Sequence, residues 1–214
     1  MIMKFFINYY LKISIFFLFT ISSITVFSQS GTFNLTSDTE VNVEGSSTLH
    51  SWKTVVNNVE GELVAGNKFA KMKLKEGEEV GTVSLKFEVA SMDGGRGDAM
   101  NDKITNALKA SEAPFIEFTS TEPAKINSIT NKTENTFTIL SKGDLSMAGK
   151  TQPVEIELEG KYIDENTIEF TGKREMKMSD FDIEQPSAMF GTIVAGDDIT
   201  INFNLQFSNS TNKM

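Results

Sequence analysis

The sequence predicts an all-β protein, an antiparallel sandwich or barrel that carries one short helix. The first observation is that apolar and polar side chains alternate with a period of two in most segments of the chain, as in strands with one dry and one wet face. The second is that the connections between these segments have the length of hairpins, which favours antiparallel order. Alternation alone does not distinguish a sandwich from a barrel.

The first 28 residues are expected to form a secretory signal peptide. Lys4 and Lys12 precede an uncharged run over residues 13–27, and small or tolerated residues before Gln29 offer cleavage after Ser28. An uncleaved anchor is the alternative, but Lys12 and two serines interrupt a run that a membrane span would need to extend to about 20 apolar residues. We therefore expect residues 29–214 to form one domain, periplasmic or secreted and without a lipoprotein cysteine.

The charge and residue composition of this domain limit the classes of partner and cofactor that it is expected to bind. Without the two lysines of the leader, 18 basic residues face 29 acidic ones, a formal charge of −11. This balance argues against nucleic acid and against electrostatic adhesion to anionic lipid head groups. The chain has no cysteine and one histidine, so we expect neither disulfides nor a zinc site nor another metal or cofactor.

The predicted strands follow one another along the chain. The first, at residues 41–45, leads into a bend that holds the only histidine and the only tryptophan. Further strands are expected at 59–64, 81–90, 115–121, 137–147, 154–158 and 168–178. The last strand, at 199–207, alternates without interruption, and Gly196–Asp198 is expected to be the turn before it.

One helix is predicted between the third and fourth of these strands. Asp98 is the expected N-cap, and Met100, Ile104 and Leu108 form an apolar stripe at a spacing of four residues. The stripe ends before Pro114. Such a helix is expected to lie across or to plug the sheet, and with the glycine-rich loop before it is the predicted gate.

Four segments resemble the YceI-like family of secreted bacterial lipid-binding proteins, in the order of that family. They lie at Ser47–Trp52, Arg96–Ser120, Gly143–Val154 and, in two parts, Met178–Phe181 with Gly191–Ile199. The resemblance implies an eight-stranded antiparallel lipocalin-like barrel with one short helix after the third or fourth strand. It also implies an apolar interior that takes a long isoprenoid or fatty chain. The family frequently has polar residues at three positions where this chain has Met178, Ala99 and Ala148. The resemblance therefore does not imply which head group the ligand carries.

Inward-facing residues on the predicted strands are the candidates for ligand contact. They are Phe87, Phe118, Phe137, Ile139, Met147, Ile156, Phe170, Arg174, Met176, Met178 and Phe203. Ordinary core packing is the alternative at each apolar position. The chain's 17 Phe and 10 Met, some of them in the leader, favour a deformable apolar lining, because Met adapts to irregular shapes.

Arg174 is the one charged candidate. It shares its strand face with Phe170 and Met176, so an unbroken register would turn its guanidinium toward the dry side, where a charge needs a partner or a ligand head group. The alternative is a bulge at Gly172 that returns Arg174 to water. His50 stands alone and is expected to be structural.

These observations predict a protein that binds and carries or sequesters a polyisoprenoid, an isoprenoid quinone or a fatty-chain amide in the cell envelope. Because such a ligand is drawn from a bilayer, transient membrane contact is expected; the oligomeric state, a dimer included, stays open. The first alternative is an adhesion or stress-response interaction protein with a packed core. A lipid or glycan hydrolase is the weaker alternative, since the chain has no G-x-S-x-G motif. No catalytic residue is predicted.

Overall fold

A computed structural model describes residues 31–209 of the chain. The predicted leader, residues 1–28, lies outside these residues. The strands form one sheet that closes into an eight-stranded antiparallel barrel, with β13 pairing β11 on one side and β1 and β2 on the other. The expected barrel is confirmed, and closure of the sheet excludes a sandwich.

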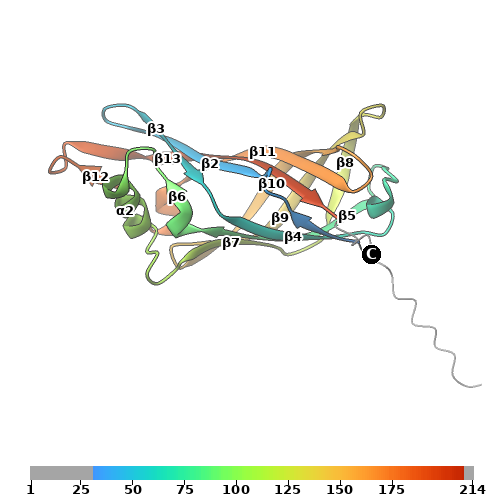
Figure 1. The fold of residues 1–214 in the computed structure, drawn as a ribbon, viewed down its shortest axis with the longest axis horizontal. Coiled ribbons are helices and arrows are strands. Elements are labelled where there is room, and N and C mark those ends of the chain that lie inside the picture. The colour runs from blue at the N-terminus through green and yellow to red at the C-terminus, as the bar shows by residue number, and fades with distance from the viewer. Residues whose placement is uncertain (1–30, 210–214) are drawn as a thin grey trace, which may run out of the picture.

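Several barrel strands are interrupted and carry two labels each (Figure 1). The interrupted strands are β1 (Gly31–Leu35) with β2 (Glu40–Ser47), β3 (Ser51–Val56) with β4 (Val59–Ala65), β5 (Glu79–Glu88) with β6 (Met92–Asp93), and β7 (Phe115–Ser120) with β8 (Ala124–Asn131). The continuous ones are β9 (Thr136–Met147), β10 (Lys150–Tyr162), β11 (Thr167–Lys177) and β13 (Ile193–Ser208). A 3₁₀ turn, η2 (Val89–Ser91), joins β5 to β6.

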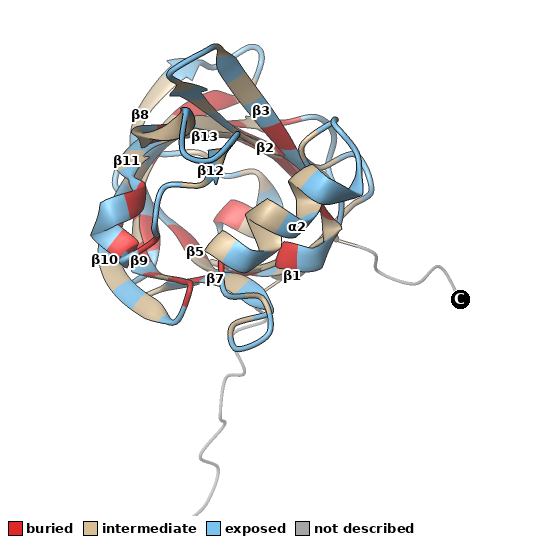
Figure 2. Ribbon diagram, turned by 90° about the vertical axis from the view of Figure 1, so that its left-hand side faces the viewer, coloured by how far each residue is buried: buried red, intermediate tan, exposed pale blue. Residues whose placement is uncertain are grey.

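The barrel has two different ends. Helix α2 (Asp98–Ala107), the two-residue strand β12 (Ser187–Ala188) and the 3₁₀ turn η3 (Met178–Phe181) belong to one of them, which we call the α2 end. Figure 2 looks onto this end and shows α2 and β12 lying across the ring of strands. The opposite end carries the 3₁₀ turn η1 (Phe69–Lys71), and we call it the η1 end.

The η1 end is filled by aromatic rings, which we call the aromatic plug: Phe69, Phe137, Tyr162, Phe170 and Phe207. Phe137 packs edge-on against Phe69, with ring centroids 5.5 Å apart, and against Phe170 at 6.2 Å. The hydroxyl of Tyr162 donates a hydrogen bond to the backbone carbonyl of Phe69, and burial raises the pKa of Tyr162. Edge-to-face contacts of this kind add about 0.5–1.5 kcal/mol each beyond the buried area.

The strands predicted from alternation are present, with two corrections nearby. Gly196–Asp198 is not a turn before the last strand but lies inside β13, where the register against β2 shifts between Ala195 and Ile199, a bulge. The N-cap of α2 is Gly97, not Asp98, which instead places its carboxylate in the first turn beside the positive helix end.

Five strands were not predicted: β1, β3, β6, β8 and β12. Strands β1 and β8 lack a clear alternation of apolar and polar residues, because they contain few apolar residues and several Thr and Asn. Among residues 31–209, no helix has the length and apolarity that a membrane crossing requires.

Candidate ligand-binding site

The barrel interior holds a cavity of about 110 Å³, the barrel cavity. Its walls come from strands all around the barrel, because alternation turns one face of each strand inward. Apart from Gly81, Ser120, Ser141 and Arg174, every lining residue is apolar, and the lining contains no carboxylate from the part of the chain that the structure describes.

A second cavity of about 180 Å³, the mouth cavity, lies at the α2 end. The apolar stripe of α2 forms one wall through Met100, Ile104, Ala107 and Leu108, so the helix lies across the barrel as predicted. Both cavities share five lining residues: Val43, Met92, Ile116, Leu145 and Ile201. The two cavities are therefore neighbours along the barrel, separated by a partition of side chains.

Many side chains that face the barrel cavity are only partly buried. Phe87, Ile156, Met176 and Phe203 point inward in a closed barrel and still keep accessible surface, whereas Phe137 in the aromatic plug is 0% exposed. A packed interior would leave no such surface, because protein cores have few voids larger than a water molecule. The barrel is therefore filled at the η1 end and hollow toward the α2 end.

The cavities bring together ten of the eleven predicted ligand-contact residues. Phe87, Phe118, Ile139, Ile156, Phe170, Arg174, Met176 and Phe203 line the barrel cavity, and Met147 and Met178 line the mouth cavity. Phe137 borders neither cavity and belongs to the aromatic plug.

Sequence reasoning missed other lining residues. Val43 and Val83 follow the same alternation as the predicted candidates and could have been found by it. Ala124 lies on β8, a strand that was not predicted. Pro186 and Ile193 line the mouth cavity from a loop and a strand end, where no period marks an inward side.

Arg174 faces the barrel cavity. The register between β11 and β13 runs unbroken over eleven pairs, so Gly172 marks no bulge and that alternative is wrong. Arg174 Nη1 donates to the backbone carbonyl of Glu155 at 3.1 Å, while its Nε is buried and has no partner among the described residues. A buried donor left unpaired costs about 1–3 kcal/mol.

The contact between Arg174 and Glu155 spans a weak line in the barrel wall. Strand β10 pairs with β9 over twelve positions but with β11 over only four, Glu159–Thr171 to Tyr162–Ile168. Toward the α2 end, residues 150–158 of β10 and 172–177 of β11 have no ladder pairs between them; we call this line the seam.

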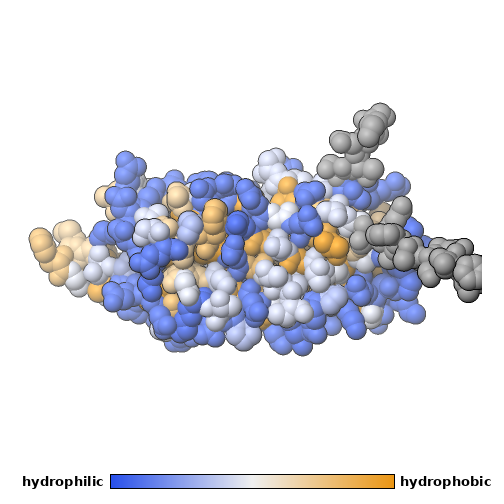
Figure 3. All heavy atoms as spheres, turned by 90° about the horizontal axis from the view of Figure 1, so that it is seen from below, coloured by the Kyte–Doolittle hydropathy of each residue, from blue (hydrophilic) through white to orange (hydrophobic). Residues whose placement is uncertain are grey.

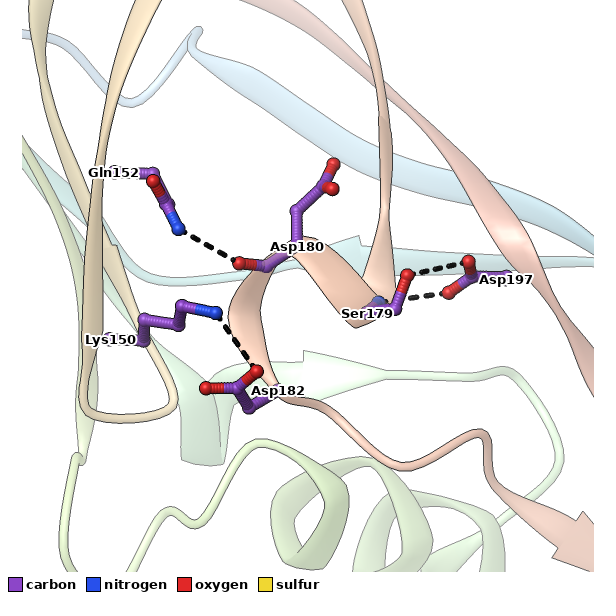
Figure 4. A network of polar contacts seen from close by, with 6 residues as sticks. All are labelled: Lys150, Gln152, Ser179, Asp180, Asp182 and Asp197. Carbon is purple, nitrogen blue, oxygen red and sulfur yellow. Dashed lines mark hydrogen bonds and ion pairs between the residues drawn. The ribbon is translucent and has the colours of Figure 1, made fainter.

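Side chains close the outer part of the seam (Figure 4). Lys150 Nζ lies 2.9 Å from Asp182 Oδ1, and the side-chain amide of Gln152 donates to the carbonyl of Asp180 at 3.2 Å. The hydroxyl and the backbone N–H of Ser179 donate to Asp197 at 2.7 and 2.8 Å, and these two bonds hold the pKa of Asp197 below its usual value.

Helix α2 is fastened at its base but buries none of its residues. The side chain of Asn101 accepts from the N–H of Gly94 at 3.0 Å and donates to Asp93 at 3.3 Å. A Cβ at position 94 would stand 2.8 Å from Met100 Cγ, so a larger residue here would force the Met100 side chain to move. Lys103 Nζ donates to the carbonyl of Ser187 at 2.6 Å and joins the helix to β12.

Residues 31–209 contain no group of three or more His, Cys, Asp or Glu side chains that could hold a metal ion. His50 lines the mouth cavity, and its Nδ1 is buried without a partner in this part of the chain. The site therefore consists of two adjoining apolar cavities, with the guanidinium of Arg174 in the wall of the barrel cavity and His50, Lys53, Arg96 and Lys103 around the mouth cavity.

Solved structures with this fold include three from different bacteria. BcnA of Burkholderia cenocepacia has a TM-score of 0.59 and 18% identity, over 78% of this chain and 95% of that one. A polyisoprenoid binding domain of Saccharophagus degradans, implicated in plant cell wall breakdown, has a TM-score of 0.62 and 11% identity, over 85% and 99%. The YceI protein of Campylobacter jejuni has a TM-score of 0.54 and 18% identity, over 74% and 85%.

At these identities the likeness to solved structures shows the fold alone. No curated protein matches the chain. The model of the YceI-like domain matches residues 17–207, which is most of the sequence and includes every strand that forms the two cavities except the last residue of β13. The chain therefore belongs to the YceI-like family.

Proposed function

We propose that this protein binds a long-chain apolar ligand inside its barrel and carries or sequesters it in the cell envelope. The observation that carries the proposal is the pair of adjoining cavities with apolar walls, whose inward side chains keep accessible surface. The polyisoprenoid-binding description of the Saccharophagus domain supports the same ligand class. Binding is proposed over catalysis, since neither cavity is lined by a carboxylate or a possible metal-ligand cluster from the described residues.

The ligand is proposed to run along the barrel axis, with its apolar end against the aromatic plug. Ligand pockets usually measure about 300–1,000 Å³, which exceeds the 110 and 180 Å³ of the two cavities. A long chain would therefore displace side chains of the partition, and Met92 is suited to this because its unbranched thioether adapts its shape.

The ligand class follows from the polar atoms that meet the cavity. Arg174 lines the barrel cavity, and its buried Nε–H has no partner among the described residues; such a donor suits an oxygen acceptor, for example a quinone or amide carbonyl. Polyisoprenoids, isoprenoid quinones and fatty-chain amides all fit the apolar part. Each buried methylene contributes about 0.8 kcal/mol relative to water, so loading from a bilayer, where the chain is already apolar, makes uptake and release nearly balanced.

The first test is mass spectrometry of an organic extract from protein purified from its native envelope without detergent. We expect a long-chain species in stoichiometric amount. An empty barrel that also takes up no added isoprenoid would contradict the proposal and favour the packed-core interaction protein.

A cavity variant sharpens this test. Val43→Trp would fill the partition between the two cavities, so the bound ligand should become shorter or be lost. Val55→Trp on the neighbouring strand β3 is the matched control, because Val55 is exposed and lines neither cavity. Equal ligand profiles for both variants would contradict a ligand that spans the partition.

A further inference from the structure

We propose that the tip of the α2 end is a docking surface for a phospholipid bilayer, formed by Leu49, Met189 and Phe190. Leu49 is 67% exposed, Met189 is 70% exposed and Phe190 is fully exposed, which makes them the three most exposed large apolar side chains of the described residues. We call them the apolar tip. Figure 3 shows apolar atoms gathered at the extreme of this end of the molecule.

The backbone of the apolar tip has a defined conformation. Met189 and Phe190 both adopt positive φ, at 50° and 56°, a conformation that bulky residues rarely take. Gly191 N–H donates to the carbonyl of Ala188 at 3.1 Å and closes the turn between β12 and β13. Strained backbone of this kind persists where the surrounding structure holds it, and it is typical of functional sites.

The two loops of the tip are joined to each other. The backbone N–H of Thr48 donates to the carbonyl of Val194 at 3.0 Å, and its hydroxyl donates to the carbonyl of Thr192 at 3.2 Å. Leu49 is thereby held beside the turn that carries Met189 and Phe190. The three side chains form one surface on two connected loops.

The tip adjoins the mouth cavity. Four residues close to it in the chain line that cavity: Ser47, His50, Ala188 and Ile193. A binding partner that covers the apolar tip would therefore also contact the opening of the mouth cavity, through which an apolar chain can pass.

The charges around the mouth fit lipid phosphates. The mouth cavity is lined by Lys53, Arg96 and Lys103 and by no carboxylate of residues 31–209, although the chain carries 29 acidic residues against 20 basic ones. Of the three cations, Lys53 pairs with Glu44 and Lys103 with a backbone carbonyl, and the exposed Arg96 has no partner in residues 31–209. Apolar side chains beside an opening lined by cations match a membrane interface, where apolar groups enter below the phosphates.

The size of the tip also favours a membrane over a protein. A stable protein interface buries about 800 Å² on each partner and involves about 20–30 residues, far more than three side chains supply. Shallow insertion of a few apolar side chains is sufficient for reversible membrane contact, and reversible contact is what a carrier needs. The biological role of this membrane contact rests on the proposed carrier function, but membrane binding itself can be tested independently of it.

The test is flotation of the protein with vesicles of phosphatidylcholine and phosphatidylethanolamine. All variants retain the same N-terminus, so any contribution of the leader is equal among them. We expect the triple variant Leu49→Ser, Met189→Ser, Phe190→Ser to bind vesicles at least tenfold more weakly than the unaltered protein. Ile163→Ser is the matched control, because Ile163 is 49% exposed but lies in the turn between β10 and β11. Binding of the triple variant at the unaltered level, or no vesicle binding by the unaltered protein, overturns the proposal.

A second readout locates the contact. Tryptophan fluorescence of Phe190→Trp should shift to shorter wavelength when vesicles are added, and that of Ile163→Trp should not. Mass spectrometry of extracts from the same preparations separates this proposal from the carrier function. A ligand-loaded protein that ignores vesicles contradicts the docking surface alone, whereas an empty protein that binds vesicles through the tip contradicts the carrier alone.

Discussion

The two ends of this barrel are built from the same alternating strands and differ in what fills them. At the η1 end, five aromatic rings meet and leave Phe137 without exposed surface. Toward the α2 end, inward side chains border cavities, and a helix with no buried residue lies across the opening. The difference is one of packing, and under the proposed function it assigns stability to one half of the barrel and ligand contact to the other.

The largest expected effect tests this division directly. Phe137→Ala removes a ring from the aromatic plug and should lower the free energy of unfolding by about 3–5 kcal/mol. Phe203→Ala, which removes the same group beside the barrel cavity, should cost less than half as much, because Phe203 already borders empty space. Chemical denaturation of both variants measures the difference; equal losses would show that the two ends are packed alike.

The same two regions show which features of the site can be predicted from the sequence. Alternation identified Phe87, Phe170 and Phe203 as inward-facing, because the period of two depends only on the local backbone. It could not separate the filled end from the hollow one, since Phe137 and Phe203 carry the same signal and differ only in which rings their neighbours bring across the barrel.

Features without a local period were beyond prediction. The seam depends on how β10 and β11 diverge after Thr171, which is a property of the closed barrel and not of either strand. The apolar tip lies in two turns that are far apart in the sequence and are brought together by the pairing of β2 with β13 and by the hydrogen bonds of Thr48. The closed barrel itself was predicted from the family resemblance, and alternation alone left a sandwich open.

A smaller effect is expected at the seam. Arg174→Met keeps an unbranched apolar side chain, shorter than that of Arg, and removes the guanidinium of a residue that lines the barrel cavity. We expect stability to change little, because the buried unpaired Nε disappears together with the hydrogen bond to Glu155. Affinity for a ligand with a carbonyl head group should fall about tenfold, which corresponds to about 1.4 kcal/mol.

The control for Arg174→Met is a substitution at the neighbouring residue, Lys173, whose side chain points outward. Lys173→Met alters an exposed residue on the opposite face of β11, whose amine contacts Glu175 in the solvent. Titration of both variants with a fluorescent quinone or fatty amide measures the difference. If Arg174→Met and Lys173→Met bind the probe equally well, Arg174 plays no part in recognising the head group.

The smallest expected effect concerns pH and the aromatic plug. Burial raises the pKa of Tyr162 above its value of about 10 in an unfolded chain. The folded state therefore favours the neutral phenol, and this contribution is complete below about pH 10 and is lost as the pH rises from there toward the folded pKa. Tyr162→Phe removes this dependence, and at neutral pH it costs about 0.5–1.5 kcal/mol because the carbonyl of Phe69 loses its donor.

Denaturant unfolding of both proteins between about pH 9 and pH 11 measures the effect. The advantage of the unaltered protein over Tyr162→Phe should shrink with rising pH, while groups common to both cancel. The other two tyrosines, Tyr9 and Tyr10, lie in the predicted leader, so the phenolate absorbance of processed protein reports on Tyr162 alone. A constant difference between the two proteins would show that Tyr162 titrates as it does in water, and the η1 end would then be more open than its rings indicate.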